Sequence, residues 1–228
     1  MPSIPIVLSV GGSLVAPKSG IDVAFLKSLR TLIRKHVQKG RRFVIVVGGG
    51  STARVYQKAA GAIVPLADED VDWIGIHATR LNGHLLRTLF RDIALHRVVK
   101  DPSRPLVWNR HVLIAAGWKP GWSTDYVAVR LARKFKAATV VNLTNTDGVY
   151  DKDPSLHEDA QRISRIDWKS FRKIVGHRWE PGANAPFDPV ASRLAAHSKM
   201  TVVVMKGHDL RGLDAFLKGK KFRGTVIE

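Results

Sequence analysis

The stretch FVIVVGGGSTAR, residues 43–54, indicates the class of fold. Its first five residues form an uninterrupted apolar run, which predicts a strand buried on both faces, as in a parallel sheet. Three glycines at 48–50 then end the strand, and a helix is predicted from about Ser51. A buried strand, a glycine turn and a helix in succession are typical of an α/β protein.

The same order recurs on both sides of this stretch. Residues 6–10 predict a strand that ends at Gly11-Gly12, and Asp22 is expected to cap a helix that stops near Gly40. Further strands are predicted at 112–115, 139–143, 201–205 and 224–227, the last of them at an edge of the sheet. We therefore expect a mainly parallel sheet with helices on both faces, and ligands beyond the carboxyl ends of the strands.

The composition is that of a globular protein. Of the 228 residues, 45% are hydrophobic and 25% charged, which is enough apolar material for a sizeable core. No signal peptide is recognisable, and no apolar run approaches the roughly 18 residues that span a bilayer. The absence of cysteine excludes disulfides and thiolate metal sites. These features lead us to expect a cytoplasmic protein without a membrane partner.

The net charge of +18 favours anionic ligands such as nucleotides or nucleic acids. The cations are spread over residues 27–42, 130–136 and 218–223, however, and can also be read as solvated helix faces. No zinc finger, RNA-binding motif or basic-aromatic platform accompanies them. Nucleic acid is therefore not expected as the main partner.

Two glycine turns, at 11–13 and 48–50, are the first candidate binding elements. Neither matches the Walker or the dinucleotide-binding pattern. Two such turns at neighbouring strand ends nevertheless predict a shared polyphosphate site, because their exposed N–H groups attract phosphate oxygens. Arg54, one turn into the following helix, suits a phosphate contact or an ordinary surface position.

Two further elements combine polar residues with a helix start. Asp72 is interpreted as a helix N-cap, and its carboxylate could also accept hydrogen bonds from ribose hydroxyls. In GWKPGWSTD, residues 117–125, Ser123 and Thr124 suit phosphate contacts, and Asp125 suits capping or metal organisation. A simple capped loop is the alternative for this stretch.

The most informative segment is NLTNTDGVYDKDP, residues 142–154. A hairpin turn explains Asp147-Gly148 but not the rest of the string. His77 and His84 share a predicted helix but are seven residues apart without a metal-binding glutamate, so we predict no metal site made by the protein itself.

Five blocks in this sequence resemble successive motifs of UMP (uridylate) kinases, with the archaeal-type branch of that group as the better match. The blocks are VGGSL (10–14), VVGGGSTAR (46–54), DWIGIHATRLN (72–82), GWKPGWSTD (117–125) and TNTDGVYDKDP (144–154). The third block distinguishes uridylate kinases from other members of the amino-acid-kinase superfamily.

The resemblance implies a three-layer α/β/α sandwich formed by residues 1–228 as one amino-acid-kinase domain. It implies transfer of the γ-phosphoryl group of ATP to UMP, in pyrimidine nucleotide biosynthesis, with the acceptor toward the N-terminal half and ATP toward the C-terminal half. Mg²⁺ would accompany ATP, and a homohexamer is typical of the family.

The resemblance also implies residue roles. Gly12, Ser13 and Arg54 would be catalytic. The implied ATP-binding residues are Gly12, Ser13, Gly50, Arg54, Thr144, Asn145, Tyr150 and Asp153. The implied UMP-binding residues are Gly49, Asp72, Trp118, Lys119, Pro120, Gly121, Trp122, Ser123 and Thr124.

Three departures from the family pattern stand out. Ser9-Val10 occupy the place of a lysine in bacterial uridylate kinases, and Trp122 replaces a usual His or Phe. Residues 180–193 fit only partly and are better read as the start of a helix than as catalytic machinery. The alternatives are a kinase of the same superfamily with another acceptor, or a non-catalytic member that binds an oxyanion or RNA.

Overall fold

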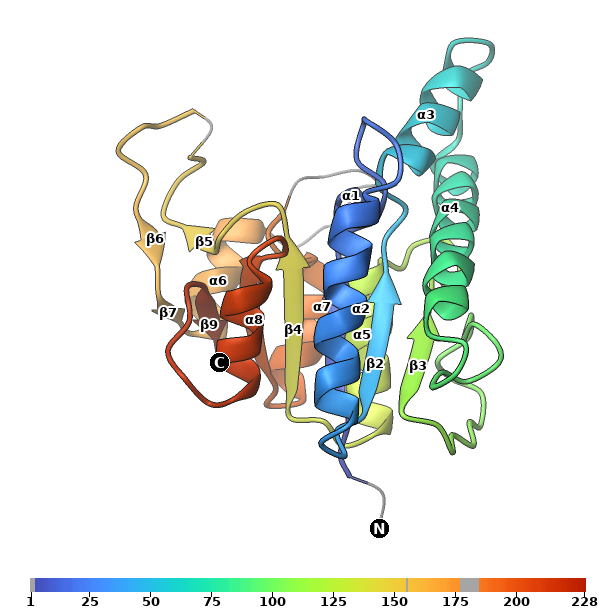
Figure 1. Ribbon diagram of the computed structural model, residues 1–228. Coiled ribbons are helices and arrows are strands. Elements are labelled where there is room, and N and C mark those ends of the chain that lie inside the picture. The colour runs from blue at the N-terminus through green and yellow to red at the C-terminus, as the bar shows by residue number, and fades with distance from the viewer. Residues whose placement is uncertain (1–2, 155, 177–184) are drawn as a thin grey trace.

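The computed structural model describes residues 3–154, 156–176 and 185–228 (Figure 1). Helices and strands alternate along most of the chain. The strands are β1 Ile6–Val10, β2 Phe43–Val47, β3 Val112–Ala115, β4 Thr139–Thr144, β5 Val149–Tyr150, β6 Arg162–Ile163, β7 Arg165–Ile166, β8 Thr201–Lys206 and β9 Thr225–Ile227. The helices are α1 Gly12–Val15, α2 Val23–Val37, α3 Gly50–Gly61, α4 Asp68–Leu89, α5 Thr124–Lys134, α6 Trp168–Val175, α7 Pro189–His197 and α8 Leu210–Leu217.

Seven of the strands form one sheet in the order β3-β2-β1-β4-β8-β9-β7. The first five run parallel, which confirms the expected mainly parallel sheet. The expectation that the last strand lies at an edge is wrong. β9 pairs antiparallel with β8 on one side and parallel with β7 on the other, because Arg165 and Ile166 pair with Val226 and Ile227.

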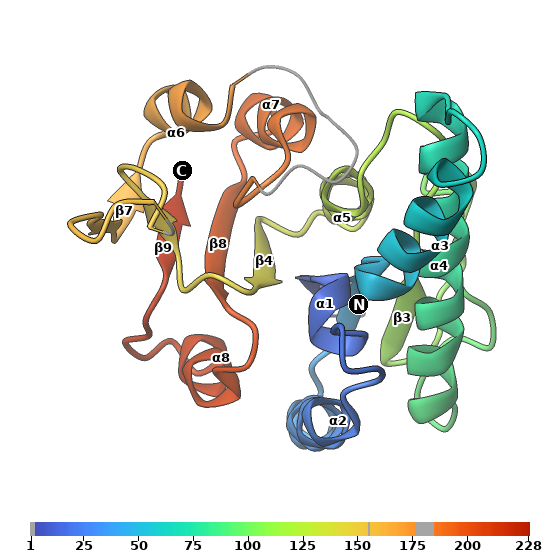
Figure 2. The ribbon, with the colours of Figure 1, turned by 90° about the horizontal axis from the view of Figure 1, so that it is seen from above.

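The helices cover both faces of the sheet, which confirms the three-layer sandwich (Figure 2). Alternate strand residues point to opposite faces. Val7 of β1 joins the apolar cluster beneath α5 and α7, whereas the next residue, Leu8, joins the cluster beneath α2 and α8. Both residues are fully buried, so each strand contributes to two cores.

Capping side chains fix the starts of several helices. Asp22 accepts a hydrogen bond from the Phe25 N–H at 2.8 Å and begins α2 as predicted. Asp188 caps α7, with Pro189 as its first residue, which agrees with reading this stretch as a helix start. The part of that stretch from 180 to 184 lies outside the described residues. Within the described ranges, no helix has the length and apolarity to span a membrane.

Candidate functional site

The order of the strands places a crevice beside β1. β2 pairs with one edge of β1, and β4 pairs with the opposite edge of β1. Such a reversal in strand order leaves an opening at the carboxyl ends of the two neighbouring strands, where open α/β sheets bind ligands. The glycine turn after β1 and the polar end of β4 both lie at this opening.

The two glycine turns, which follow neighbouring strands, contact each other. A Cβ atom on Gly12 would lie 2.0 Å from the Gly50 nitrogen, and one on Gly50 would lie 2.3 Å from the Gly12 carbonyl oxygen. Gly50 also has a φ of +65°, which side chains rarely tolerate. Both positions therefore need glycine, and the contact brings the starts of α1 and α3 together.

Asn82, from α4, fixes the backbone of the second glycine turn by hydrogen bonds. This buried side chain donates hydrogen bonds to the carbonyl oxygens of Gly48 at 2.9 Å and Gly49 at 3.1 Å. The C=O and N–H groups of a trans peptide point in opposite directions. Tying down these two carbonyls therefore turns the N–H groups of Gly49 and Gly50 toward the opposite side, at the N-terminus of α3, where an anion is favoured.

A cavity of about 230 Å³ lies next to this turn, between α3, α4 and the loop before α5. It brings together seven of the residues singled out from the sequence: Gly49, Gly50, Arg54, Asp72, Trp122, Ser123 and Thr124. We call it the acceptor cavity. Arg54 is exposed and lies at its wall, so a cation is available beside the amides of the glycine turn.

Asp72 does not cap a helix, so that interpretation is wrong. Helix α4 begins four residues earlier, at Asp68, after Ala67 in an extended conformation. Asp72 lies one turn inside the helix and accepts a hydrogen bond from the Gly121 N–H at 2.7 Å. Burial raises the pKa of its carboxyl group, although this hydrogen bond opposes the shift. The carboxylate thus faces the loop before α5 and the acceptor cavity.

The acceptor cavity also contains residues that were not singled out. These are Ala53, Gln57, Val71, Gly75, Ile76, Thr79 and Gly117. Helical periodicity could have found three of them, because residues 75, 76 and 79 share a face with Asp72. Thr79 accepts a hydrogen bond from the Gly117 N–H at 2.7 Å and donates one to the Ile76 carbonyl at 2.6 Å. It therefore joins α4 to the loop that follows β3.

Trp122 forms an aromatic wall of this cavity. Its ring centroid lies 4.0 Å from that of Tyr126, with the planes tilted by 32°, and 6.1 Å from that of Trp118. Ser123 caps α5 by accepting a hydrogen bond from the Tyr126 N–H at 3.1 Å. The loop is thus a capped helix start, and it also presents a flat aromatic surface to the cavity.

The predicted acceptor loop is divided between two cavities. Trp118 and Lys119 line a separate cavity together with the loop between α4 and β3, and Arg80 donates to the Trp118 carbonyl at 3.0 Å. Gly121 meets Asp72, whereas Trp122 to Thr124 line the acceptor cavity. Pro120 lies between the two groups.

Four of the residues predicted to contact ATP, Thr144, Asn145, Tyr150 and Asp153, come from β4 and the segment that follows it. Asn145, just after β4, donates a hydrogen bond to the Ser13 hydroxyl at 2.9 Å, so the ends of β1 and β4 are joined. Thr144 ends β4, and its carbonyl accepts from the Gly207 N–H at 2.7 Å. These residues therefore lie together at the crevice.

Tyr150 and Asp153 lie farther along the chain, in β5 and the turn after it. The Tyr150 hydroxyl donates to Asp147 at 2.6 Å, and this contact raises the tyrosine pKa. Asp147 also accepts from the Arg223 guanidinium at 2.6 Å. Because β5 pairs with β6 and not with β4, the Asp147-Gly148 turn does not close a hairpin between consecutive strands.

Two carboxylates lie at the same end of the sheet, Asp188 buried and Asp125 half-buried. Asp125 accepts hydrogen bonds from the Ser9 hydroxyl at 2.7 Å and from the Asp188 N–H at 3.3 Å. Burial raises the pKa of Asp125 to about 6 and is also the main cause of the raised pKa of Asp188. In the described part of the chain neither carboxylate has a cationic partner among the ion pairs.

A divalent cation would depend mostly on its ligand's own oxygens. The described residues contain no group of three or more His, Asp or Glu side chains arranged to hold a metal ion. Ser13 and Asn145, in contact at the crevice, offer neutral oxygen atoms of the kind that Mg²⁺ accepts beside phosphate. The site thus fits Mg²⁺ that enters with a nucleotide.

A mainly parallel sheet, covered on both faces and carrying two contacting glycine turns at its strand reversal, defines an α/β/α protein of the phosphate-binding class. The sequence profile described as the amino acid kinase family matches residues 5–206. The chain belongs to the amino acid kinase family and, within it, to the uridylate kinases.

Three relatives illustrate this membership. Uridylate kinase from Methanococcus aeolicus is 37% identical over 207 residues, with 89% of this chain and 90% of that protein covered. The crystal structure of uridylate kinase from Archaeoglobus fulgidus superposes with a TM-score of 0.81 at 31% identity, over 98% of this chain and 100% of that one. UMP kinase from Bacillus anthracis has a TM-score of 0.80 over 100% of this chain and 97% of that one, but only 18% identity, and it supports the fold alone.

Proposed function

We propose that this protein transfers the γ-phosphoryl group of ATP to UMP, giving ADP and UDP. The observation that carries this proposal is the contact between the two glycine turns, with the acceptor cavity directly beside them. One anion site shared by two turns suits a reaction in which two phosphate chains must meet. The relatives named uridylate kinase cover almost the whole chain and support UMP as the acceptor.

The site suggests where each substrate binds. We place UMP in the acceptor cavity, with Asp72 on the ribose hydroxyls and Trp122 against the nucleoside. ATP would lie over the ends of β1 and β4, with its phosphates near Gly12, Ser13 and Gly50 and its nucleoside toward Tyr150 and Asp153. In this arrangement the N-terminal half of the chain holds the acceptor and the C-terminal half holds ATP.

The chemistry needs positioning more than proton transfer. An oxygen of the UMP phosphate attacks the γ-phosphorus as the bond to the β-phosphate oxygen breaks, and this nucleophile is already anionic. No general base is therefore required. The N–H groups of the glycine turns and the Arg54 guanidinium would stabilise the negative charge on the transferred group.

Mg²⁺ bound with ATP would neutralise phosphate charge at this point. Ser13 and Asn145 are the residues that would hold it, beside the phosphate oxygens. We also propose that the protein works as a homohexamer in the cytoplasm, in pyrimidine nucleotide biosynthesis. Light scattering of the purified protein would test the hexamer, and a particle of any other size would contradict it.

An acceptor screen tests the proposed reaction. ADP release from Mg-ATP would be measured with UMP, CMP, dUMP, AMP, GMP, acetylglutamate and aspartate, each presented separately. We expect strong turnover with UMP. Silence with UMP but activity on another acceptor would keep the family and overturn the substrate, and no ATP-dependent turnover on any acceptor would favour a binding protein.

A further inference from the structure

Gln57 is a polar residue of the acceptor cavity that has no role in the reaction as proposed so far. It lies on α3, and its side chain is half-buried. About two turns of helix, or roughly 10 Å along the axis, separate it from Gly50. Arg54 lies one turn closer to the glycine turn, on the same face of the helix. Along α3 the cavity wall therefore presents backbone amides first, then a cation, then a carboxamide.

A hydrogen bond to α4 decides which end of this carboxamide is free. The Gln57 Nε2 atom donates to the Val71 carbonyl oxygen at 2.8 Å. A carbonyl oxygen can only accept, so the nitrogen must face Val71 and the oxygen Oε1 is left over. Oε1 accepts no hydrogen bond from any residue that the structure describes. Gln57 thus offers an oriented, neutral acceptor to the cavity that it lines.

Asp72 offers a second acceptor beside the first. It directly follows Val71 in α4, and its Oδ2 atom accepts from the Gly121 N–H at 2.7 Å. Its other oxygen, Oδ1, has no donor among the described residues. Helices α3 and α4 lie side by side (Figure 1), so the two free oxygens line the cavity from adjacent helices.

Two neighbouring acceptors match the two hydroxyl donors of a ribose. A hydroxyl group donates one hydrogen bond, so each of the two free oxygens can serve one hydroxyl. In a nucleoside 5′-monophosphate the 3′-hydroxyl is the one nearer to the phosphate, and the 2′-hydroxyl lies beside the base. The pairing therefore depends on which acceptor is farther from the phosphate.

The packing of the glycine turn against α4 indicates that order. A Cβ atom on Gly49 would lie 3.3 Å from the Gly75 carbonyl oxygen and 3.4 Å from the Ala78 Cβ. The phosphate end of the cavity is thus level with residues 75–78 of α4, and Val71 is the lining residue of that helix farthest from it. Gln57, bound to Val71, faces the hydroxyl farther from the phosphate.

We propose that Gln57 Oε1 accepts a hydrogen bond from the 2′-hydroxyl of the acceptor nucleotide and makes the protein select ribonucleotides over 2′-deoxyribonucleotides. Asp72 Oδ1 then serves the 3′-hydroxyl. This inference rests on the proposed function, because it assigns a further contact in the same acceptor cavity. A site built to hydrogen-bond a hydroxyl rejects the analogue that lacks it, since its own polar group is then left without a partner.

The test compares kcat/KM for UMP and dUMP in the parent protein and in Gln57→Leu, at saturating Mg-ATP. We expect the parent to prefer UMP by about tenfold, the size of one hydrogen bond. Gln57→Leu should lower kcat/KM for UMP about tenfold and should not lower that for dUMP, because dUMP never makes this bond. 3′-Deoxy-UMP retains the 2′-hydroxyl and should lose as much as UMP.

Two matched controls accompany this comparison. Arg54→Ala removes a phosphate contact from the same wall, so it should lower kcat/KM for UMP and dUMP by the same factor. Gln38→Leu makes the same chemical change at the exposed C-cap of α2 and should leave both values unchanged. The ratio of the two substrates therefore isolates the hydroxyl contact from general damage to the site.

Three results would overturn the proposal. The first is an equal fall for UMP and dUMP in Gln57→Leu, which loss of the Val71 contact alone would produce. The second is a changed ratio of UMP to CMP with an unchanged ratio of UMP to dUMP, which would place Gln57 at the base. The third is a fall for UMP and dUMP but not for 3′-deoxy-UMP, which would assign Gln57 to the other hydroxyl. A parent protein without turnover of UMP would instead contradict the proposed function, and this inference with it.

Discussion

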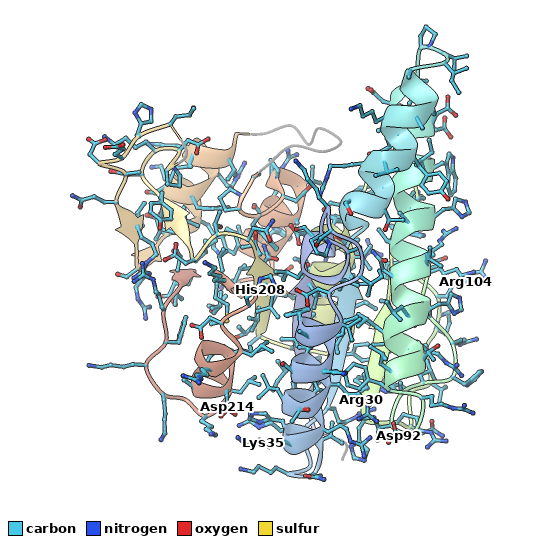
Figure 3. All side chains as sticks on the ribbon, turned by 45° about the horizontal axis from the view of Figure 1, so that its top comes forward. Arg30, Lys35, Asp92, Arg104, His208 and Asp214 are labelled. Carbon is cyan, nitrogen blue, oxygen red and sulfur yellow. The ribbon has the colours of Figure 1, made fainter. Side chains whose placement is uncertain are left out.

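Carboxylates near opposite ends of the sheet have different kinds of partner. At the carboxyl ends of the strands, Asp125 and Asp188 are hydrogen-bonded to neutral donors. Near the other end, between α2 and α8, Asp214 contacts three basic side chains: Lys35 at 3.2 Å, His36 at 2.8 Å and Lys218. Figure 3 labels Lys35 and Asp214 in this second group, which we call the Asp214 cluster.

The contributions of these two sets of side chains to the stability of the fold change with pH in opposite directions. Burial raises the pKa of Asp125 from 3.8 to about 6, so its contribution to stability falls as the pH rises from about 4 to 6. In the Asp214 cluster, hydrogen bonding from Lys218 is the main cause of the lowered pKa of Asp214, and burial lowers the pKa of His36. The contribution of His36 is lost as the pH falls below 6.5, and that of Asp214 as the pH falls through its own lowered pKa.

The difference separates function from stability. A carboxylate that lacks a cation costs stability, and proteins keep such groups mainly where ligands bind. A carboxylate satisfied by several donors holds two helices together. Substitutions at the carboxyl end should therefore affect turnover and, where they remove a carboxylate that lacks a cation, raise stability. Substitutions in the Asp214 cluster should lower stability.

The largest effect is expected for Arg54→Ala. Removing one contact to the charge that develops on the transferred group costs about 2.7–4 kcal/mol, so turnover should fall roughly a hundred- to thousandfold. Arg54 is exposed, and the protein should stay folded. Steady-state turnover and thermal melting measure the two quantities. The control is Arg91→Ala, another exposed arginine, and equal turnover in both variants would remove Arg54 from the site.

Asp125→Asn should change the pH dependence of stability. The variant lacks the group whose pKa rises to about 6, so it should gain up to about 3 kcal/mol relative to the parent between pH 4 and 7. Asparagine fits this position because the Ser9 hydroxyl can accept as well as donate. Chemical denaturation at several pH values measures the difference, and parallel pH profiles for the two proteins would contradict the assignment.

Asp214→Ala should destabilise the protein without changing its turnover. It leaves the buried His36 Nε2 atom without its partner, at a cost of about 2 kcal/mol, or roughly 4–8 °C in Tm. The control is Asp92→Ala, which breaks a more exposed ion pair with Arg34 and should cost less than about 1 kcal/mol. A larger loss of stability in the control would reverse the comparison.

The smallest effect is expected for Asp72→Asn. The amide oxygen can still accept from the Gly121 N–H, so the loop should keep its position while the charge is lost. We expect the KM for UMP to rise about tenfold, the range of one charge-assisted hydrogen bond, with little change in the KM for ATP. Equal weakening of both substrates would exclude a ribose contact for this residue.

Much of the fold was predictable because local patterns and tertiary packing agree. The apolar runs at 6–10 and 43–47 became fully paired inner strands, and Asp22 caps its helix as predicted. Local patterns failed where a neighbour in space decided the outcome. Asp72 fits a cap by sequence, yet α4 starts earlier and the carboxylate meets a loop 49 residues away.

By itself, the sequence determined the class of fold, the parallel strands and the adjacency of the two glycine turns, because periodicity and glycine positions are local properties. The tertiary structure alone decided how the loop at 118–124 is divided between two cavities, how Asn82 orients a glycine turn, and which carboxylates lack a cation. These features depend on contacts between segments far apart in the chain, and a linear pattern does not contain those distances.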